Sequence, residues 1–332
     1  MHRFIVYSIL VNGKTEFFYQ EAGRQMGVFH NAKVTLCASM LIFGSIGLLV
    51  RGIALPASVI ALCRGVIGAI FLLCLCAAAK TRVCFPAIRK NAALLLCSGA
   101  ALGANWIFLF EAYRHTTIAV ATLCYYFAPV LIMAASPVVL KERLTGAKLG
   151  CMAASILGMA LVSGITGSSA GASGIGVLFG LAAAASYASF TLMSKFTKEI
   201  SALDATIAQL GVAAVVLFPY VLFTGGFAQL QWQAQNLWQL LILGIVHTGL
   251  GFFLFFSSIQ RLNAQTAAML SYIDPVTAIL LSTLFLHEKM GGVQLIGACL
   301  ILGAAFLSER FKGKTAQKIP PAAVSPQTIS LP

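Results

Sequence analysis

The chain has 332 residues, of which 59% are hydrophobic and 9% are charged, and its mean hydropathy is +0.92. A soluble domain of ordinary composition carries about 25% charged residues, so this composition excludes a soluble globular protein. The net charge of +13 could suggest a nucleic-acid-binding protein. The positions of the basic residues, given below, indicate membrane orientation instead.

Residues 1–33 are expected to form a cytoplasmic N-terminal segment. The apolar run from Phe4 to Val11 is short for the core of a signal peptide, and no small-residue cleavage site follows it. Met26 lies just ahead of the first long apolar stretch, so translation could begin at Met1 or at Met26. N-terminal peptide mapping would separate the two.

Ten apolar stretches of roughly 17–25 residues follow, each long enough to cross a bilayer. They must be helices, because an isolated strand in lipid would leave its backbone groups unpaired. They are expected at residues 34–50, 57–79, 92–112, 116–140, 146–164, 174–194, 202–224, 237–259, 263–286 and 292–308. The fold class is therefore all-α and polytopic, with ten transmembrane helices.

Two parts of the chain carry the same pattern at a fixed offset of 146 residues, without a gap. The eight identities are Gly103/Gly249, Phe110/Phe256, Ala121/Ala267, Tyr126/Tyr272, Pro129/Pro275, Val130/Val276, Leu140/Leu286 and Glu142/Glu288. They indicate a duplication into two five-helix repeats. Since five is odd, the second repeat enters the membrane inverted relative to the first.

The basic residues test this arrangement. With the N-terminus in the cytoplasm, 18 of the 22 Lys and Arg residues fall on the inside. Only Arg51, Arg114 and Lys289 fall outside, and Arg64 lies within a helix. The positive-inside rule predicts this bias, and an even number of helices then places both termini in the cytoplasm.

The expected organisation is an N-terminal segment (1–33), a first repeat (34–164), a linker (165–173), a second repeat (174–308) and a tail (309–332). The linker reads ITGSSAGAS. The tail is basic and then proline-rich, and we expect it to be a disordered cytoplasmic end.

No motif for metal binding, nucleotide hydrolysis or covalent catalysis occurs in the chain. Nine scattered cysteines form no CxxC pair, and there is no GxxxxGK[ST], GxSxG or HExxH. We expect no metal and no cofactor, and the function predicted is not enzymatic. Two GxxxG pairs, Gly99 with Gly103 and Gly176 with Gly180, predict close helix packing.

Two prolines, Pro129 and Pro275, lie near the middle of the fourth and ninth stretches, each three residues after a tyrosine. Proline removes a helix hydrogen bond and kinks the chain. Helices broken at the midplane are where secondary transporters place substrate groups. Both prolines therefore predict a kink, which either lies beside a binding site or serves helix packing alone.

Ionisable groups inside the expected helices are few and mark candidate functional sites. Asp274 lies at the centre of the ninth stretch, where it could bind a proton, a sodium ion or a substrate ammonium group. His247 lies near the middle of the eighth stretch, and a relay between His247 and Asp274 is one interpretation. Their counterparts at the offset are Ala101 and Ala128, so neither residue is required by the fold.

Arg64 in the second stretch could pair with Glu111 near the outer end of the third, as a gate or a structural ion pair. Glu111 could instead pair with Arg114, three residues on. Aromatic walls with a few polar tips suit small organic solutes. The candidate substrate-binding residues are Asn105, Trp106, Tyr125, Tyr126, Tyr187, His247, Tyr272 and Asp274.

The chain resembles the EamA domain of the drug/metabolite transporter superfamily. The resemblance rests on GANWIFLFEAYRHTTIAVATLCYYFAPVLIMAASPVVLKERLTGAKLG and on GFFLFFSSIQRLNAQTAAMLSYIDPVTAILLSTLFLHEKMGGVQLIG. It covers about residues 34–310, and Arg64 matches a recurring arginine of the family. Glu142 and Glu288 match the family glutamates at the membrane edges, where they could organise the turn before the next helix. Where many members carry Trp in the first span, this chain has Phe43.

The resemblance implies ten helices in inverted repeats and transport of small metabolites. We expect a secondary transporter in the cytoplasmic membrane of a prokaryote that exports amino acids or related compounds by alternating access, with possible proton or sodium coupling. A facilitative carrier or channel without ion coupling is the alternative, and a polytopic membrane enzyme is a remote one. The expected partners are a small-molecule substrate and membrane lipid, not nucleic acid, and the protein could be a monomer or a homodimer.

Overall fold

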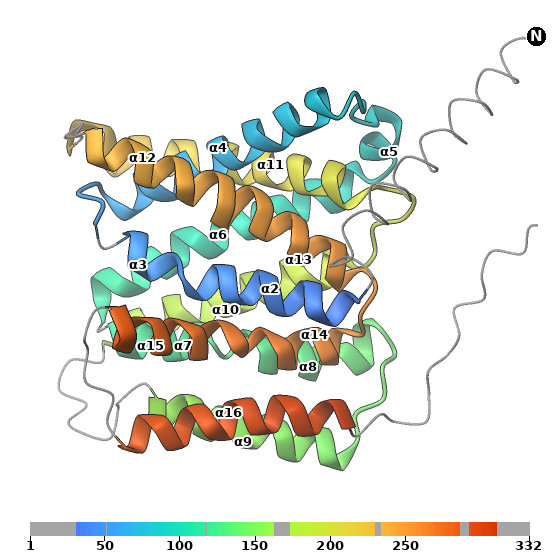
Figure 1. The fold of residues 1–332 in the computed structure, drawn as a ribbon, viewed down its shortest axis with the longest axis vertical. Coiled ribbons are helices and arrows are strands. Elements are labelled where there is room, and N and C mark those ends of the chain that lie inside the picture. Colours follow the sequence, from blue (N-terminus) through green and yellow to red (C-terminus); the bar gives the residue numbers. More distant parts are fainter. Residues whose placement is uncertain are drawn as a thin grey trace, which may run out of the picture.

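A computed structural model describes residues 31–50, 52–116, 118–162, 173–229, 234–285 and 292–310. These residues are helical, without strands, and the helices lie side by side along one direction (Figure 1). The first half contains α2 (Ala32–Gly44), α3 (Ile46–Val50), α4 (Ala57–Ala78), α5 (Phe85–Lys90), α6 (Ala92–His115), α7 (Ile118–Tyr125), α8 (Ala128–Val139) and α9 (Gly146–Val162). The second half contains α10 (Gly174–Ser194), α11 (Ala202–Phe223), η2 (Gly226–Gln229), α12 (Ala234–Ile242), η3 (Leu243–Leu250), α13 (Gly251–Ile259), α14 (Ala264–Ser271), α15 (Ile273–Phe285) and α16 (Gly292–Arg310).

Seven helical stretches among the described residues are long and apolar enough to cross a membrane. They are Ala32–Val50, Ala57–Ala78, Ala92–His115, Val120–Val139, Gly174–Ser194, Ala202–Phe223 and Asn236–Ile259. Two further apolar helices, Gly146–Leu161 and Leu295–Ser308, are shorter. All ten expected stretches coincide with helix, and the polytopic character is confirmed, while the count of ten crossings stays a prediction. The expectations for residues 1–30, most of the linker, Glu288 and residues 311–332 lie outside the described residues.

Two pairs of helices begin at the offset seen in the sequence. Helix α7 covers residues 118–125 and α14 covers 264–271, while α9 begins at residue 146 and α16 at residue 292. Each pair of starts is 146 residues apart.

Three of the long helical stretches are interrupted. The first is broken at Ser45, between α2 and α3, and the fourth at Tyr126 and Phe127, between α7 and α8. In the ninth region the break lies at Tyr272, between α14 and α15. The last two breaks come two to three residues before Pro129 and Pro275, because a proline lacks the N–H of its helical turn and its ring crowds the preceding turn.

The eighth stretch stays continuous but changes its winding. Eight residues, Leu243–Leu250, form a π-helix between α12 and α13. Thr248 Oγ1 accordingly bonds the carbonyl of Leu243 five residues earlier, whereas Ser258 in α13 reaches back four residues to Leu254. Short π segments inside helices are frequent at functional sites.

Glycines allow the closest helix contacts. A Cβ added at Gly99 would lie 2.7 Å from Val212 Cβ of α11, and one at Gly103 would lie 3.0 Å from Val216 Cβ. Gly180 faces Cys124 Cβ of α7 in the same way, at 2.6 Å. The packing role predicted for the two GxxxG pairs is confirmed.

The two broken helices converge at one end of the bundle and separate at the other. Helix α8 packs against α14, whereas α7 packs against α10 and α15 packs against α2 and α3. No contact of comparable extent joins α7 to α15 in the described part of the chain. We call the end where α8 meets α14 the basic end, because Lys141, Arg143, Lys148, Lys195 and Lys198 lie there.

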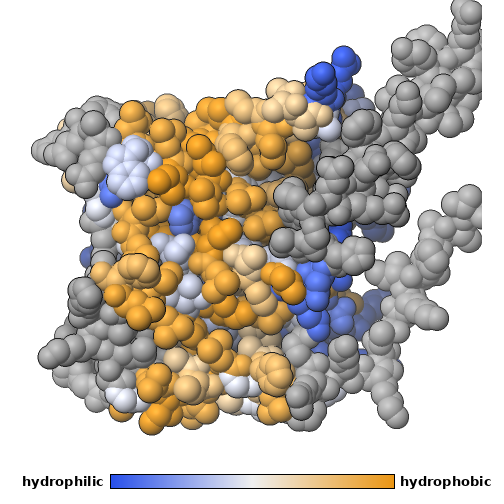
Figure 2. All heavy atoms as spheres, in the orientation of Figure 1, coloured by the Kyte–Doolittle hydropathy of each residue, from blue (hydrophilic) through white to orange (hydrophobic). Residues whose placement is uncertain are grey.

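The outer faces of the bundle are apolar. Large exposed side chains such as Val138, Val215, Phe223 and Phe306 are between 66% and 86% accessible. Figure 2 shows an apolar band over the visible face, with hydrophilic residues gathered toward the side where α5 and the start of α14 lie. A surface of this kind matches lipid around the middle of a membrane protein.

Replacing Gly99 by Val should destabilise the bundle. The added methyl groups would overlap Val212 and the carbonyl oxygen of Gln209, so we expect a loss of about 1–3 kcal/mol in unfolding free energy. Thermal unfolding of the purified protein in detergent measures the effect. Gly211→Val on α11 is the control, because a Cβ at Gly211 meets nothing within 4 Å; equal melting temperatures for the two variants would refute the packing argument.

Candidate functional site

Arg64 of α4 lies over the indole ring of Trp106 of α6, with 4.2 Å between Cζ and the ring centroid. Its Nε atom is buried and has no hydrogen-bond partner among the described residues. A guanidinium over an aromatic face is held by a cation–π interaction, which leaves its N–H donors free. Arg64 is therefore placed to bind a carboxylate that the described residues do not supply.

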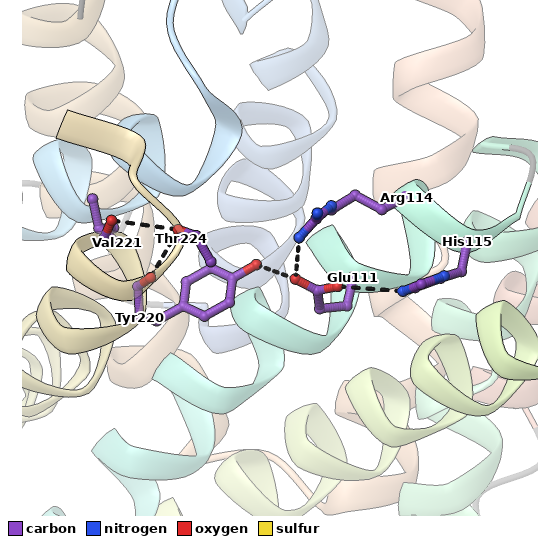
Figure 3. Close-up of polar contacts among 6 residues, drawn as sticks. All are labelled: Glu111, Arg114, His115, Tyr220, Val221 and Thr224. Atoms are coloured by element: carbon purple, nitrogen blue, oxygen red, sulfur yellow. Dashed lines mark hydrogen bonds and ion pairs between the residues drawn. The ribbon is translucent and has the colours of Figure 1, made fainter. Parts of the chain in front are cut away.

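Glu111, the residue expected to pair either with Arg64 or with Arg114, pairs with Arg114. Its Oε1 accepts a hydrogen bond from Arg114 Nη1 at 3.0 Å and one from the hydroxyl of Tyr220 on α11 at 2.5 Å (Figure 3). His115 Nε2 lies 3.6 Å from the other carboxylate oxygen. The ion pair between Arg64 and Glu111 is absent from the described contacts, and Glu111 instead joins α6 to α11 at the end of the bundle opposite the basic end.

Asp274 is the second residue of α15, directly after the break at Tyr272. Its side chain receives no hydrogen bond or ion pair from the described residues. Its carbonyl oxygen lies so close to Gly44 that an added Cβ there would be 2.6 Å away. The breaks of the first and ninth regions are therefore in contact, and an unpaired carboxylate lies beside them.

Three of the predicted tyrosines, Tyr125, Tyr126 and Tyr187, lie near Asp274. The rings of Tyr125 and Tyr126 have centroids 5.4 Å apart, and Tyr125 meets Tyr187 of α10 edge to face at 6.0 Å. The structure thus brings these three predicted residues together.

Two other predicted residues are engaged in packing. Asn105 is 1% exposed, and its Nδ2 donates to the carbonyl of Ala183 at 2.8 Å, which ties α6 to α10. Tyr272 is also 1% exposed and packs among Met133, Met269 and other apolar side chains, with its hydroxyl unpaired within the described residues. Within the described residues, neither Asn105 nor Tyr272 makes a polar contact with Asp274.

His247 lies in the π-helix and reaches the break of the first stretch. Its Nε2 is 3.0 Å from Ser45 Oγ, and the Ser45 hydroxyl is also 2.8 Å from the carbonyl of Ile42. The Ser45 hydroxyl donates to the Ile42 carbonyl, and its contact with His247 Nε2 joins the break of the first stretch to the π-helix. His247 also lies near Arg64, and through Ser45 it reaches the residue next to Gly44.

Ser45 and Gln265 make polar contacts that no sequence pattern indicates. Ser45 is one of two serines in an apolar stretch, and Gln265 has Ala119 as its counterpart at the offset. Gln265 lies at the basic end, where its amide contacts Lys148 and Ser136. Tyr220 likewise belongs to no motif or repeated pattern that would indicate its contact with Glu111.

Glu142 also has a different role from the one expected. Its carboxylate does not organise the turn before α9 but accepts hydrogen bonds from the backbone of α14, at Ala264 and Gln265. Within the residues that the structure describes, no group of three His, Cys, Asp or Glu side chains could hold a metal ion.

Known proteins share both the sequence pattern and the fold. The EamA-like transporter family matches residues 31–164 and again residues 174–310. The uncharacterized transporter YxxF of Bacillus subtilis (strain 168) is 31% identical over 296 residues, which cover 85% of this chain and 91% of that protein. Protein PecM of Dickeya dadantii (strain 3937) is 24% identical over 208 residues, covering 62% of this chain and 69% of PecM.

A solved crystal structure superposes with a TM-score of 0.71 at 20% identity, covering 83% of this chain and 96% of that one. At this identity the match shows a common fold. The two family matches and the YxxF relative go further, and together with the apolar helices they show that this chain belongs to the EamA-like transporter family.

Proposed function

We propose that the protein is a secondary carrier that exports a small zwitterionic metabolite, an amino acid or a close relative, across the cytoplasmic membrane. The observation that carries the proposal is the pair of opposite charges without ionic partners, Arg64 over Trp106 and Asp274 at the broken helix. A charge inside a membrane protein is costly unless it is paired, and such charges mark substrate and ion paths.

A zwitterion supplies both missing partners. Its carboxylate would accept hydrogen bonds from the Arg64 guanidinium, whose forked donors match a carboxylate. Its ammonium group would bind Asp274, beside Tyr125 and Tyr187. The rings of Trp106, Tyr125 and Tyr187 would contact an apolar side chain of the substrate.

Alternating access explains why two broken helices converge at one end only. We place the basic end in the cytoplasm, following the positive-inside rule, and both termini there with it. The helix starts repeated at an offset of 146 residues support ten crossings in two inverted repeats. Contact between α8 and α14 then closes the cytoplasmic side, while α7 and α15 separate toward the outside.

Asp274 also offers a means of coupling. One carboxylate can hold a proton or a substrate ammonium group, but not both at once. Binding a proton from outside would therefore release the substrate, and binding the substrate inside would release the proton. In such an exchange, protons that enter the cell down their gradient drive the substrate out of it.

Asp274→Asn should abolish coupled export. The amide keeps the size but loses the charge, so we expect export to fall by about thirtyfold or more. Wild type and variant would be expressed in a bacterial host, and metabolites inside and outside the cells measured by mass spectrometry. Glu199→Gln is the control, because Glu199 is an exposed acid paired with Lys90 on the surface.

The outcomes separate the alternatives. Equal export and equal pH dependence in Asp274→Asn would contradict the role of Asp274. Transport that persists without pH dependence in the wild type would favour a facilitative carrier, and flux that does not saturate with substrate would favour a channel.

Arg64→Lys should weaken substrate binding while leaving a positive charge in place. Lysine lacks the planar fork and its stacking on Trp106, so we expect about a tenfold rise in the substrate concentration for half-maximal transport. Trp106→Phe keeps an aromatic face and should change this value less. Transport into proteoliposomes measures both, and an unchanged half-saturating concentration in Arg64→Lys would rule out a carboxylate site at Arg64.

A further inference from the structure

Helix α14 obtains its N-terminal cap from the other half of the protein. The first N–H groups of a helix have no partner within the helix, and a nearby side chain usually accepts from them. In α2 and α11 the residues before the helix, Asn31 and Ser201, do so. Asn263 precedes α14 but makes no such bond.

The cap comes instead from Glu142, 122 residues earlier in the chain. One carboxylate oxygen accepts from the Ala264 N–H at 2.7 Å, and the other accepts from the Gln265 N–H at 3.2 Å. A carboxylate at this position also interacts favourably with the positive end of the helix dipole. The start of α14 is therefore held by a residue that follows α8.

The side chain of Gln265 adds contacts between the same two segments. Its Oε1 accepts from Lys148 Nζ at 2.7 Å, and its Nε2 donates to Ser136 Oγ at 3.0 Å. The same nitrogen lies 3.4 Å from the carbonyl oxygens of Glu142 and Arg143. All of these contacts cross from the α8–α9 region of the first repeat to α14 of the second.

These bonds lie where the two broken helices converge. Opening the basic end requires α8 to move away from α14, and that movement breaks the bonds of Glu142. Both the carboxylate and the freed N–H groups can then bind water at this end, so the net cost of breaking these bonds is small. Such contacts hold one state without preventing the other.

We propose that Glu142 is a positioning residue that latches the cytoplasmic side of the transporter closed by capping α14, and that the latch opens and re-forms in each transport cycle. The inference rests on the proposed alternating access. It adds a specific bond on which the balance between the inward-open and outward-open states depends.

Two substitutions remove the same bond from its two sides. Glu142→Ala removes the acceptor, and Ala264→Pro removes the Ala264 N–H. Proline is favourable at the first position of a helix, and Asn263, at φ −65° and ψ 148°, already has the extended backbone that precedes proline. Glu199→Ala removes an exposed acid at the same end and is the matched control.

The measurement is sided labelling of one cysteine. Ala135→Cys, on α8 beside Ser136, would be introduced into the full chain with its nine cysteines replaced and with transport retained. A membrane-impermeant maleimide would then be applied to either side of sealed vesicles. We expect cytoplasmic labelling to rise about fivefold in Glu142→Ala and in Ala264→Pro, the population change that a typical helix cap supplies, and to stay unchanged in Glu199→Ala.

The double variant Glu142→Ala/Ala264→Pro should label no faster than the faster single variant, because both changes remove one interaction. Unchanged labelling in the single variants, or independent effects that multiply in the double variant, would overturn the latch. Loss of folded protein in both single variants would overturn it as well, since a bond that opens in every cycle cannot be essential for folding. Transport of zwitterions in the same vesicles tests the proposed function separately, because the labelling requires no substrate.

Discussion

Lipid cannot satisfy the hydrogen bonds of an interrupted helix, and this constraint determines where the chemistry of the protein lies. Each interruption must be surrounded by other helices. The break at Ser45 meets the π-helix through His247, and Gly44 packs on the carbonyl of Asp274 at the break of the ninth region. The helix breaks therefore gather inside the bundle, where they lie close to the charged side chains that the lipid would exclude.

Different polar contacts hold the helices together at the two ends of the bundle. At one end Glu111 accepts hydrogen bonds from Tyr220 and Arg114, and the bond from Tyr220 holds α6 and α11 together. At the basic end Glu142 and Gln265 join the segment of α8 and α9 to α14. Close glycine contacts keep α6 fixed against α11, whereas α8 and α14 share an apolar contact and, at the basic end, polar bonds that water can replace. The second kind of contact suits elements that move relative to each other.

Features encoded locally could be predicted from the sequence. Apolar length and the repeated prolines predicted the helices and the two breaks, and the scarcity of charge singled out Arg64 and Asp274. Contacts between distant elements could not be predicted in this way. Asn105 bonds a backbone carbonyl 78 residues away, and Glu142 caps a helix rather than a neighbouring turn. Such partners depend on how helices rotate and pack, which a periodic apolar pattern does not specify.

We propose that Arg64 and Asp274 together recognise a zwitterion. The most direct measurement is the thermal stabilisation of the purified protein by three matched ligands: a hydrophobic amino acid, its amide, which lacks the negative charge, and its N-acetyl form, which lacks the positive one. Our account predicts that the free amino acid raises the melting temperature and that each singly charged form does so far less. Equal stabilisation by the amide or the N-acetyl form would show that only one of the two charges is used, and would contradict the account.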